Sequence, residues 1–411
     1  MKPFAHMKTK TCFFEDAYLE NFHPLTLTRP IYDLRVGILT LGQKWHHALG
    51  IPDMECRGVL RQHLKGVFTE FIASGSDEEI IWLNPRYIPV EVVVEKVESL
   101  KSGQGLFCDD ELIAGVVTTE MHNRWIESGM DSSDLEKVDS GPCSLTIVEN
   151  SWELFQINGQ QIRYDVNLLD LEPLHSTDDY LHSIFTSPDN IYIEKGAVIE
   201  PGAMLLADSG PIYVGKDAHI MANSIIRGAS AICRNSVIKM GARIYEDTTV
   251  GPVCKIGGEV ANTIFHSYSN KAHDGYAGNS VFGQWCNLGA DTNTSNLKNN
   301  YSTVKVSDWK TGKQSDTGQQ FIGTIMGDHS KTGINSMLNT GTLCGVCCNL
   351  FSDKYPPKFV PSFSWVSGSD IVPYHFEKAV DAMEKMMERR SVELTPAYES
   401  MMKAIFQSTS F

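Results

Sequence analysis

Residues 214–256 read VGKDAHIMANSIIRGASAICRNSVIKMGARIYEDTTVGPVCKI, and an aliphatic residue occupies every sixth position of this stretch. The eight positions are Val214, Ile220, Ile226, Ile232, Ile238, Ile244, Val250 and Ile256. A period of six fits neither the 3.6 residues of a helical turn nor the alternation of a free strand, but it is the hexapeptide period of a parallel β-helix. Each hexad then supplies one short strand and one corner, with the aliphatic side chain inside a narrow apolar shaft.

The same spacing recurs on both sides of this stretch, but the phase slips by three residues at ADSGP, and the strict period breaks after Ile256 and only partly resumes. Further aliphatic, aromatic or small residues at the six-residue spacing are Ile193, Ile199 and Leu205 before it, and Tyr276, Phe282, Leu288, Met326, Thr332, Leu338, Cys344 and Leu350 after it. Gly, Asn, Asp and Ala recur between these positions, and such residues suit corners where the backbone turns at positive φ. The pattern predicts a prism over residues 191–360.

Two further segments interrupt or follow the repeat. Residues 297–320 are polar and lack the period, which indicates a loop inserted into one coil. Residues 361–411 begin with a Pro-rich wrap, and Phe376, Val380, Met383 and Met387 then fall at helical spacing. We expect a pair of helices in this region that pack on the prism or on a neighbouring molecule.

Composition limits the classes of partner. The chain has 42% hydrophobic and 21% charged residues, which is typical of a soluble globular protein, and a formal net charge of −15. Such a charge argues against nucleic acid or an anionic membrane as a general partner, although one local Arg or Lys suffices for a phosphorylated small molecule. The N-terminus lacks the apolar core of a signal peptide, so we expect a cytoplasmic protein whose ten cysteines are reduced.

Residues 270–296, NKAHDGYAGNSVFGQWCNLGADTNTSN, form a polar interruption within the prism. His273 stands there at a predicted corner, where a His taken alone is better explained by backbone geometry than by chemistry. It is accompanied, however, by polar residues at fixed spacing: Tyr276 three residues later, Asn287 fourteen later, and Glu259 fourteen earlier. Arg243 lies a further sixteen residues before Glu259.

This set resembles the acetyltransferase half of the bifunctional N-acetylglucosamine-1-phosphate uridyltransferase/glucosamine-1-phosphate acetyltransferase family, whose members have a left-handed β-helix. The resemblance implies that His273 is the general base that takes a proton from an acceptor amine. It implies that Glu259 orients the imidazole, and that the backbone N–H of Ala290 holds the thioester carbonyl of acetyl-CoA.

The resemblance also implies a substrate-binding set. Arg243 corresponds to a contact with the acceptor phosphate, and Tyr276, Asn287 and Asn296 to contacts with the sugar. The alternative for Arg243 and Glu259 is a solvated ion pair on one face of a coil. The chain departs from the family at Ala261, where a phosphate-binding Lys is expected, and at Asp291, which replaces a Gly. Lys298 or Lys305 could supply the missing charge. Because of these departures, the acceptor need not be glucosamine-1-phosphate.

Residues 1–170 have a separate character, and residues 171–190 link them to the prism. Strand-like runs occur at 78–84 (EEIIWLN) and 88–97 (IPVEVVVEKV). The string HPLTLTRPIYDLRVGILTLGQKW, 23–45, resembles the part of sugar-1-phosphate nucleotidyltransferases that follows their phosphate loop, and more closely a short nucleotidyltransferase-like domain fused to hexapeptide domains in some bacterial proteins. The resemblance implies a Rossmann-like α/β domain.

This N-terminal region departs from the full nucleotidyltransferases. Residues 12–25, CFFEDAYLENFHPL, contain no Gly where a Gly-rich loop cradles triphosphate, and the acidic Glu15 and Asp16 stand where phosphate should lie. Asn84 occupies the place of an expected metal carboxylate. Mg²⁺ would be required if the domain is active, and its ligands are not identified.

A basic set remains in the same region. Arg29, Arg35 and Lys44 are candidates for binding a nucleotide or phosphate, and the alternative is that they are ordinary surface charges of a turn and a helix.

Together these features favour an acetyl-CoA-dependent N-acyltransferase that acts on an amino-sugar phosphate or nucleotide sugar in cell envelope biosynthesis. A homotrimer is implied by the resemblance. Two alternatives stay open. The first is a bifunctional enzyme that also makes a sugar nucleotide from NTP and a sugar-1-phosphate. The second is a non-catalytic trimeric scaffold that binds a sugar nucleotide.

Overall fold

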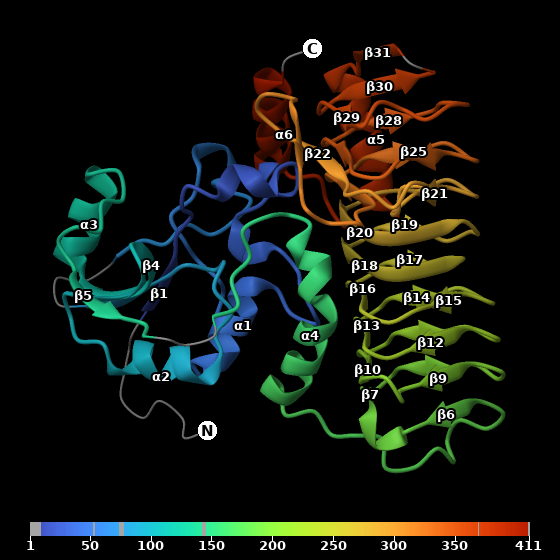
Figure 1. Ribbon diagram of the computed structural model, residues 1–411, viewed down its shortest axis with the longest axis horizontal. Helices are drawn as coiled ribbons and strands as arrows, with labels where there is room; N and C mark the ends of the chain where they lie inside the picture. The colour runs from blue at the N-terminus through green and yellow to red at the C-terminus, as the bar shows by residue number, and fades with distance from the viewer. Residues whose placement is uncertain (1–9, 52–53, 74–77, 142–144, 369, 410–411) are drawn as a thin grey trace. The chain divides into compact units, whose positions relative to one another are not determined.

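The computed structural model describes residues 10–51, 54–73, 78–141, 145–368 and 370–409, and the chain packs as two units (Figure 1). The first unit comprises Met1–Leu19, Arg29–Asp33 and Thr40–Glu149, and the second comprises Glu20–Thr28, Leu34–Leu39 and Asn150–Phe411. The domain boundaries at 170 and 190 stay predictions, since packing groups two short N-terminal segments and residues 150–170 with the second unit.

The first unit is built on a five-stranded mixed sheet in the order β1-β2-β4-β3-β5. Its strands are β1 (Lys10–Phe13), β2 (Glu79–Leu83), β3 (Gln104–Cys108), β4 (Glu111–Thr118) and β5 (Glu136–Asp139). Its helices are α1 (Leu41–Ala48), α2 (Glu91–Ser99) and α3 (Thr119–Glu127), with 3-10 turns η3 (Ile31–Asp33) and η4 (Gln62–Leu64). Strand β2 pairs in parallel with β1 and antiparallel with β4, so the predicted α/β domain is present with a mixed sheet.

The run at 88–97 is a helix in the structure, so its prediction as a strand was wrong. Helix α2 begins after Val90, and it buries Val93, Val94 and Val97 on one face. Glu91, Glu95 and Glu98 on the opposite face are exposed to solvent, which gives the 3.6-residue period of an amphipathic helix. Burial of one face therefore outweighs the preference of β-branched residues for strands.

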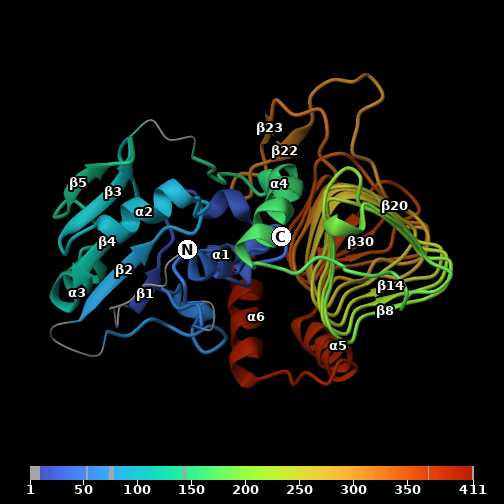
Figure 2. The same ribbon diagram turned by 90° about the horizontal axis from the view of Figure 1, so that it is seen from below.

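The second unit contains a β-solenoid whose coils run over three faces, on which strands of successive coils pair in parallel, apart from the last strand of the second face, which pairs antiparallel (Figure 2). The first face holds β7 (Ile191–Ile193), β10 (Ile212–Val214), β13 (Ser230–Ile232), β16 (Thr248–Val250), β24 (Thr324–Met326), β27 (Thr342–Cys344) and β29 (Phe359–Val360). The second face holds β8 (Val198–Ile199), β11 (His219–Ile220), β14 (Val237–Ile238), β17 (Lys255–Ile256), β19 (Asn270–Lys271), β25 (Lys331–Thr332), β28 (Asn349–Leu350), β30 (Ser364–Ser367) and β31 (Asp370–Pro373).

The third face holds β6 (Ile184–Thr186), β9 (Met204–Leu206), β12 (Ile225–Arg227), β15 (Arg243–Ile244), β21 (Asn293–Thr294) and β26 (Met337–Leu338). Two longer strands, β18 (Glu259–Ser267) and β20 (Tyr276–Gln284), run from the third face onto the first. The fold class is confirmed: an α/β domain is joined to a β-solenoid of about 10 turns with the left-handed β-helix fold, and C-terminal helices follow.

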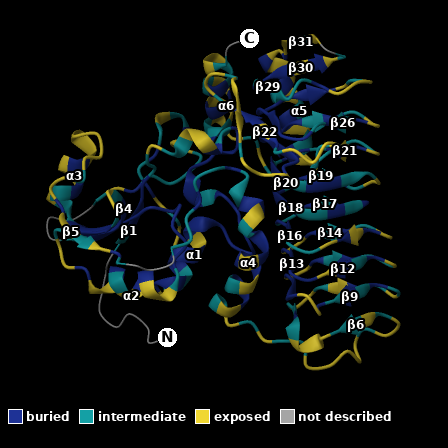
Figure 3. Cartoon of the chain, viewed as in Figure 1, coloured by how far each residue is buried: buried dark blue, intermediate teal, exposed yellow. Residues whose placement is uncertain are grey.

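The eight aliphatic positions of residues 214–256 all point into the shaft, where each is at most 1% exposed. Figure 3 shows buried and half-buried residues along the strands of the solenoid and exposed residues at many of the corners between them. Positive φ values at Asp217, Asn223, Asn235 and Asp247 recur at the corners. Asn and Asp tolerate this left-handed conformation better than other residues with side chains, which explains their recurrence.

Tyr276 does not follow the inward phase that its spacing predicts. It pairs with Glu259 on the outside of the third face, and its neighbour Ala277 fills the shaft. The inward position opposite Ile256 is taken by Lys271, a residue that the six-residue count passes over. The phase therefore shifts within the polar interruption.

Helix α4 (Glu153–Leu168) and residues 34–39 cover the first face of the solenoid. Asn158 on this helix donates to the backbone oxygen of Asp247 at 2.8 Å and accepts from the backbone N–H of Gly37 at 2.7 Å. Gly37 has φ +75°, and a Cβ there would lie 2.4 Å from Oδ2 of Asp165, so only glycine fits. The remaining 3-10 turns are η1 (Leu19–Phe22), η2 (Leu25–Leu27) and η5 (Pro188–Asn190).

The inserted segment and the C-terminus complete the second unit. The segment at 297–320 carries a small antiparallel hairpin, β22 (Lys305–Ser307) with β23 (Gln314–Asp316), in addition to loop. The predicted helix pair is confirmed as α5 (Phe376–Glu388) and α6 (Pro396–Ser408), with Met383 and Met387 buried. Among the described residues, no helix is long and apolar enough to cross a membrane.

Candidate functional site

Four of the predicted site residues lie together on the third face of the solenoid. Arg243, Glu259 and Tyr276 occupy the same register position on three successive coils. Nε of Arg243 lies 3.4 Å from Oε2 of Glu259, and the phenol oxygen of Tyr276 accepts a hydrogen bond of 3.1 Å from Nδ2 of Asn296. We call Arg243, Glu259, Tyr276 and Asn296 the third-face ladder. It offers a cation, a carboxylate, a phenol and an amide to one ligand.

The ladder ends on a half-buried tyrosine. Burial raises the pKa of Tyr276, while the hydrogen bond from Asn296 opposes the shift. The phenol is therefore protonated at neutral pH and can donate a hydrogen bond to a sugar hydroxyl or carbonyl oxygen. Its backbone N–H donates to Oδ1 of Asn293 at 2.8 Å, so the next coil fixes the backbone of Tyr276.

His273 and Ala290 lie at the corners of adjoining coils, between the second and third faces. The two corners are joined by a hydrogen bond of 3.0 Å from the backbone N–H of Asp291 to the oxygen of Asp274. His273 is exposed, and its imidazole forms no hydrogen bond or ion pair with any described residue. The N–H of Ala290 likewise has no acceptor among the described residues, although its oxygen accepts from Asn335. The corner thus presents a base and a donor that are both available to a ligand.

Two predicted relationships are not formed in the structure. The carboxylate of Glu259 pairs with Arg243, and among the described residues it makes no hydrogen bond to His273. Asn287 lies on the second face, where its Oδ1 accepts from Nδ2 of Asn270 at 2.9 Å. Asn287 therefore lies on a different face from the third-face ladder, and the sugar contact that the resemblance implies for it stays a prediction.

Lys271 is a site-related residue that sequence reasoning missed. Its side chain is 1% exposed, and Nζ donates to the backbone oxygens of Gly257, His273 and Gly275 at 3.1, 3.1 and 2.6 Å. Burial lowers the pKa of Lys271 to about 8, although the carboxylates of Asp274 and Asp291 oppose the shift. The only available signal was its register opposite Ile256, which becomes visible once the coils are aligned.

The two lysines proposed to replace the family lysine at position 261 lie in the inserted segment. Nζ of Lys298 donates to the backbone oxygen of Thr303 at 2.5 Å, which ties it to its own loop. Lys305 is exposed on β22. Neither forms a hydrogen bond or ion pair with the third-face ladder within the described part of the chain, so Arg243 is the ladder's cation.

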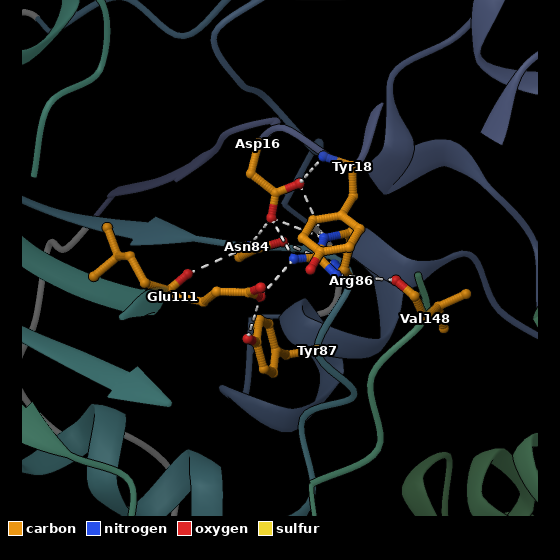
Figure 4. Close-up of polar contacts among 8 residues, drawn as sticks. Asp16, Tyr18, Asn84, Arg86, Tyr87, Glu111 and Val148 are labelled. Atoms are coloured by element: carbon orange, nitrogen blue, oxygen red, sulfur yellow. Dashed lines mark hydrogen bonds and ion pairs between the residues drawn. The ribbon is translucent and has the colours of Figure 1, made fainter. Parts of the chain in front are cut away.

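The first unit contains a second polar cluster, centred on Arg86 (Figure 4). This fully buried guanidinium pairs with Oδ2 of Asp16 at 2.5 Å and with Oε2 of Glu111 at 2.8 Å, and it lies 4.0 Å from the ring centroid of Tyr18. Burial lowers the pKa of Arg86, but hydrogen bonds and charges of the two carboxylates outweigh it, and the net shift is upward. Asp16 is therefore neutralised where the sequence suggested an unpaired acid.

The neighbouring acid is neutralised in the same way. Oε2 of Glu15 accepts from Nε of Arg61 at 2.8 Å, beside a cavity of about 630 Å³ that follows β1. Asn84 donates to Asp16 at 2.8 Å, so its amide is also engaged. No group of three His, Cys, Asp or Glu residues in the described chain could hold a metal ion. The residues present do not fit a Mg²⁺ site.

The basic set of the first 50 residues is interior in the structure. Arg29, Arg35 and Lys44 are 1%, 8% and 0% exposed, so the interpretation as surface charges was wrong. Arg29 pairs with Asp33 at 2.7 Å, and Arg35 donates to the backbone oxygens of Ile38 and, at 3.1 Å, His266. These bonds show that both arginines stabilise the local fold. A phosphate-binding role for Arg29, Arg35 and Lys44 stays a prediction.

The two units together define a class of protein: a nucleotidyltransferase-like α/β domain followed by a hexapeptide β-helix. Residues 11–172 match the family model described as sugar nucleotidyl transferase. The chain is 29% identical over 170 residues to the bifunctional protein GlmU of Synechococcus elongatus, a match that covers 37% of this chain and 33% of that protein. The resemblance indicated by the sequence is confirmed by these matches.

A second relative carries both activities in its name. The bifunctional sugar-1-phosphate nucleotidylyltransferase/acetyltransferase of Sulfurisphaera tokodaii is 28% identical over 144 residues, covering 34% of this chain and 35% of that protein. The chain thus spans about a third of the length of the curated relatives it matches. Among solved structures, the UDP-N-acetylglucosamine acyltransferase of Francisella novicida aligns with 56% of this chain and 77% of that chain, at 13% identity and a TM-score of 0.21.

Proposed function

We propose that the chain is an acetyl-CoA-dependent N-acyltransferase that acts on an amino-sugar phosphate or nucleotide sugar. The observation that carries the proposal is the corner where the imidazole of His273 and the N–H of Ala290 both lack protein partners among the described residues, next to the third-face ladder. A base and an oxyanion donor side by side are what transfer of an acyl group to an amine requires.

The proposed reaction follows from these positions. His273 takes a proton from the neutral acceptor amine as its nitrogen attacks the thioester carbonyl carbon. The N–H of Ala290 stabilises the negative charge that develops on the carbonyl oxygen. The C–S bond then breaks, and the departing thiolate takes its proton from the imidazolium, so that the amide, free coenzyme A and neutral His273 are formed.

The ladder supplies the proposed acceptor site. Arg243 binds the acceptor phosphate, and the phenol of Tyr276 and the amide of Asn296 bind the sugar. Arg243 and Glu259 have side chains that are 50% and 36% exposed, so a single chain leaves the site open on one side. We propose that a homotrimer closes it with a neighbouring solenoid, as the resemblance implies. Sedimentation of the full chain tests that assembly.

A second candidate function is sugar nucleotidyl transfer by the N-terminal domain, which would make the protein bifunctional. The match of residues 11–172 to a sugar nucleotidyl transferase model favours it. The pairing of Asp16 with Arg86 and of Glu15 with Arg61 counts against it, because these acids are then not available to a cation. Binding of a sugar nucleotide without catalysis is the reading that satisfies both observations.

One assay separates these functions. We expect the full chain to release thiol from acetyl-CoA when it is given glucosamine-1-phosphate or a related amino-sugar phosphate. Pyrophosphate release from UTP or dTTP with a sugar-1-phosphate would establish the bifunctional enzyme. Absence of thiol release across a panel of amino sugars and nucleotide-linked amino sugars, by folded protein, would overturn the acyltransferase proposal and leave the scaffold.

A further inference from the structure

A cavity of about 350 Å³ lies on the second face of the solenoid, beneath the C-terminal end of α5. Five of its lining residues are basic, namely Lys255, Lys331, Lys385, Arg389 and Arg390, and none is acidic. The chain as a whole has a formal net charge of −15. In a protein of net negative charge, five basic side chains around one cavity indicate that this cavity attracts an anion.

Most of this charge is not neutralised by the protein. Lys385 pairs with Asp381 at 2.7 Å, but Lys255, Lys331, Arg389 and Arg390 form no ion pair with any described residue. Nε of Arg390 is buried and has no hydrogen-bond partner within the described chain. A buried donor of this kind costs stability unless a ligand or water accepts from it.

The helix dipole explains only part of the cluster. Cations near the end of α5 are stabilised by the partial negative charge of a helix C-terminus. Lys255 and Lys331, however, come from β17 and β25 of the solenoid, and they face the same cavity. The positive charge of Arg390, followed by burial, lowers the pKa of Lys255, which shows that the cations repel one another. A bound anion would relieve this repulsion.

The walls of the cavity are rigid and aromatic. Tyr268 and Trp285 stack with ring centroids 4.3 Å apart, and the ring of His329 lies nearly parallel to that of Trp285, with centroids 6.0 Å apart. Trp285 is 3% exposed, so other protein groups cover both faces of its ring. The ring therefore forms part of the cavity wall and is not free to stack on the nucleobase of a ligand. Apolar walls lower the local dielectric and strengthen the attraction between the cations and an anion.

We propose that this cavity binds the phosphate chain of a ligand that carries at least two linked phosphate groups. Two linked phosphates bring two or three negative charges and enough acceptor oxygens to engage four cations from two directions, whereas a single carboxylate cannot. The volume is that of a small-ligand site. The site is separate from the third-face ladder, and the proposal does not depend on acyl transfer.

The test is calorimetric titration of the full chain with inorganic pyrophosphate at low salt. Wild type should bind it, and Lys255→Gln and Arg390→Gln should each weaken binding about tenfold, as expected for loss of a charge-assisted hydrogen bond. Lys385→Gln is the matched control, because Asp381 already neutralises that lysine, and it should change the affinity less than threefold. Titrations with UDP and with coenzyme A then show whether the diphosphate belongs to a nucleotide sugar or to an acyl donor.

Several results would overturn the proposal. Wild type that binds pyrophosphate no better than the Lys255→Gln/Arg390→Gln double variant, or equal losses in Lys385→Gln and Arg390→Gln, would show that the cations only complement the helix. Circular dichroism establishes that each variant is folded, and Lys331→Gln replaces any variant that is not. His273→Ala should retain full pyrophosphate affinity, which keeps this test independent of the acyltransferase assay.

Discussion

Nζ of Lys271 lies 3.1 Å from the backbone oxygen of His273, so a buried ammonium holds the corner that carries the proposed catalytic base. The same amine also binds the backbone oxygens of Gly257 and Gly275. On the second face, Lys271 pairs with Ile256 of the preceding coil. It thus occupies an inward position that holds an aliphatic residue in the preceding coils. At this position the shaft lacks an aliphatic side chain, and the ammonium of Lys271 instead fixes the backbone of the corner that carries His273.

Lys271→Met should change how stability depends on pH. The pKa of Lys271 is about 8 in the folded chain and about 10.4 in an unfolded one. Between these values the unfolded chain binds a proton that the folded chain has released, so the free energy of unfolding rises with pH, by at most about 1.4 kcal/mol per pH unit. Below pH 8 this group contributes no slope. Denaturant unfolding at pH 7 to 10 measures the difference between wild type and variant.

One result for Lys271→Met would contradict the burial of this amine. If the difference in unfolding free energy between wild type and Lys271→Met is flat across pH 8 to 10, the amine is not buried as described. Lys195→Met, an exposed lysine on the same solenoid, serves as the control and should show no such slope.

His273→Ala should lower acyl transfer about a hundredfold or more, because a general base contributes a factor of that order. His219→Ala is a matched control on an earlier coil, where the imidazole is bound to Glu200 at 2.6 Å. We expect the control to keep wild-type kcat. Thiol release from acetyl-CoA measures both variants, and equal rates for His273→Ala and wild type would remove the imidazole from the mechanism.

Ile244→Ala should destabilise the solenoid by about 3 kcal/mol, because it leaves a cavity in a shaft where this side chain is 1% exposed. Val198→Ala, on a strand side chain that is 50% exposed, should have a small effect. Urea denaturation compares the two. Similar losses for both would contradict the inward assignment of the six-residue repeat.

Arg86→Met should destabilise the first unit by about 2 kcal/mol. Removing one partner of a buried ion pair leaves the other charge uncompensated, which costs 3 to 5 kcal/mol when both are buried. Asp16 and Glu111 are partly exposed and recover some hydration, so the expected loss is smaller. Lys137→Met removes a surface pair with Asp110 and should have no measurable effect. Equal stability of Arg86→Met and wild type would contradict the cluster.

Local pattern predicted the solenoid and the C-terminal helices, but it was less reliable elsewhere. The valine run at 91–97 has strand-forming residues at helical spacing, and only burial of Val93 and Val97 on one face decides between the two. Arg29 and Lys44 look like surface charges in the sequence, because burial of a charge depends on partners that pattern does not reveal.

The candidate site was predictable where it follows the coils. Arg243, Glu259 and Tyr276 are brought together by the regular stacking that the period implies. Asn287 lies on another face, because it stacks on Asn270 of the second face and not on a residue of the third-face ladder, and its distance along the chain from Tyr276 carries it past that face.

The sequence by itself determined that the residues carrying the six-residue repeat form a stack of coils, and the structure extends this stack at both ends, with β6 before it and β30 after it. Each hexad buries its aliphatic residue only against neighbouring hexads, so the contacts that define the fold are short-range and repeat along the chain. Only the tertiary structure decided that Lys271 enters the shaft and that Arg390 meets Lys255 across a cavity. Such contacts join residues from different coils or from a helix and a coil, and their energies depend on burial and distance, which have no signature in the local pattern.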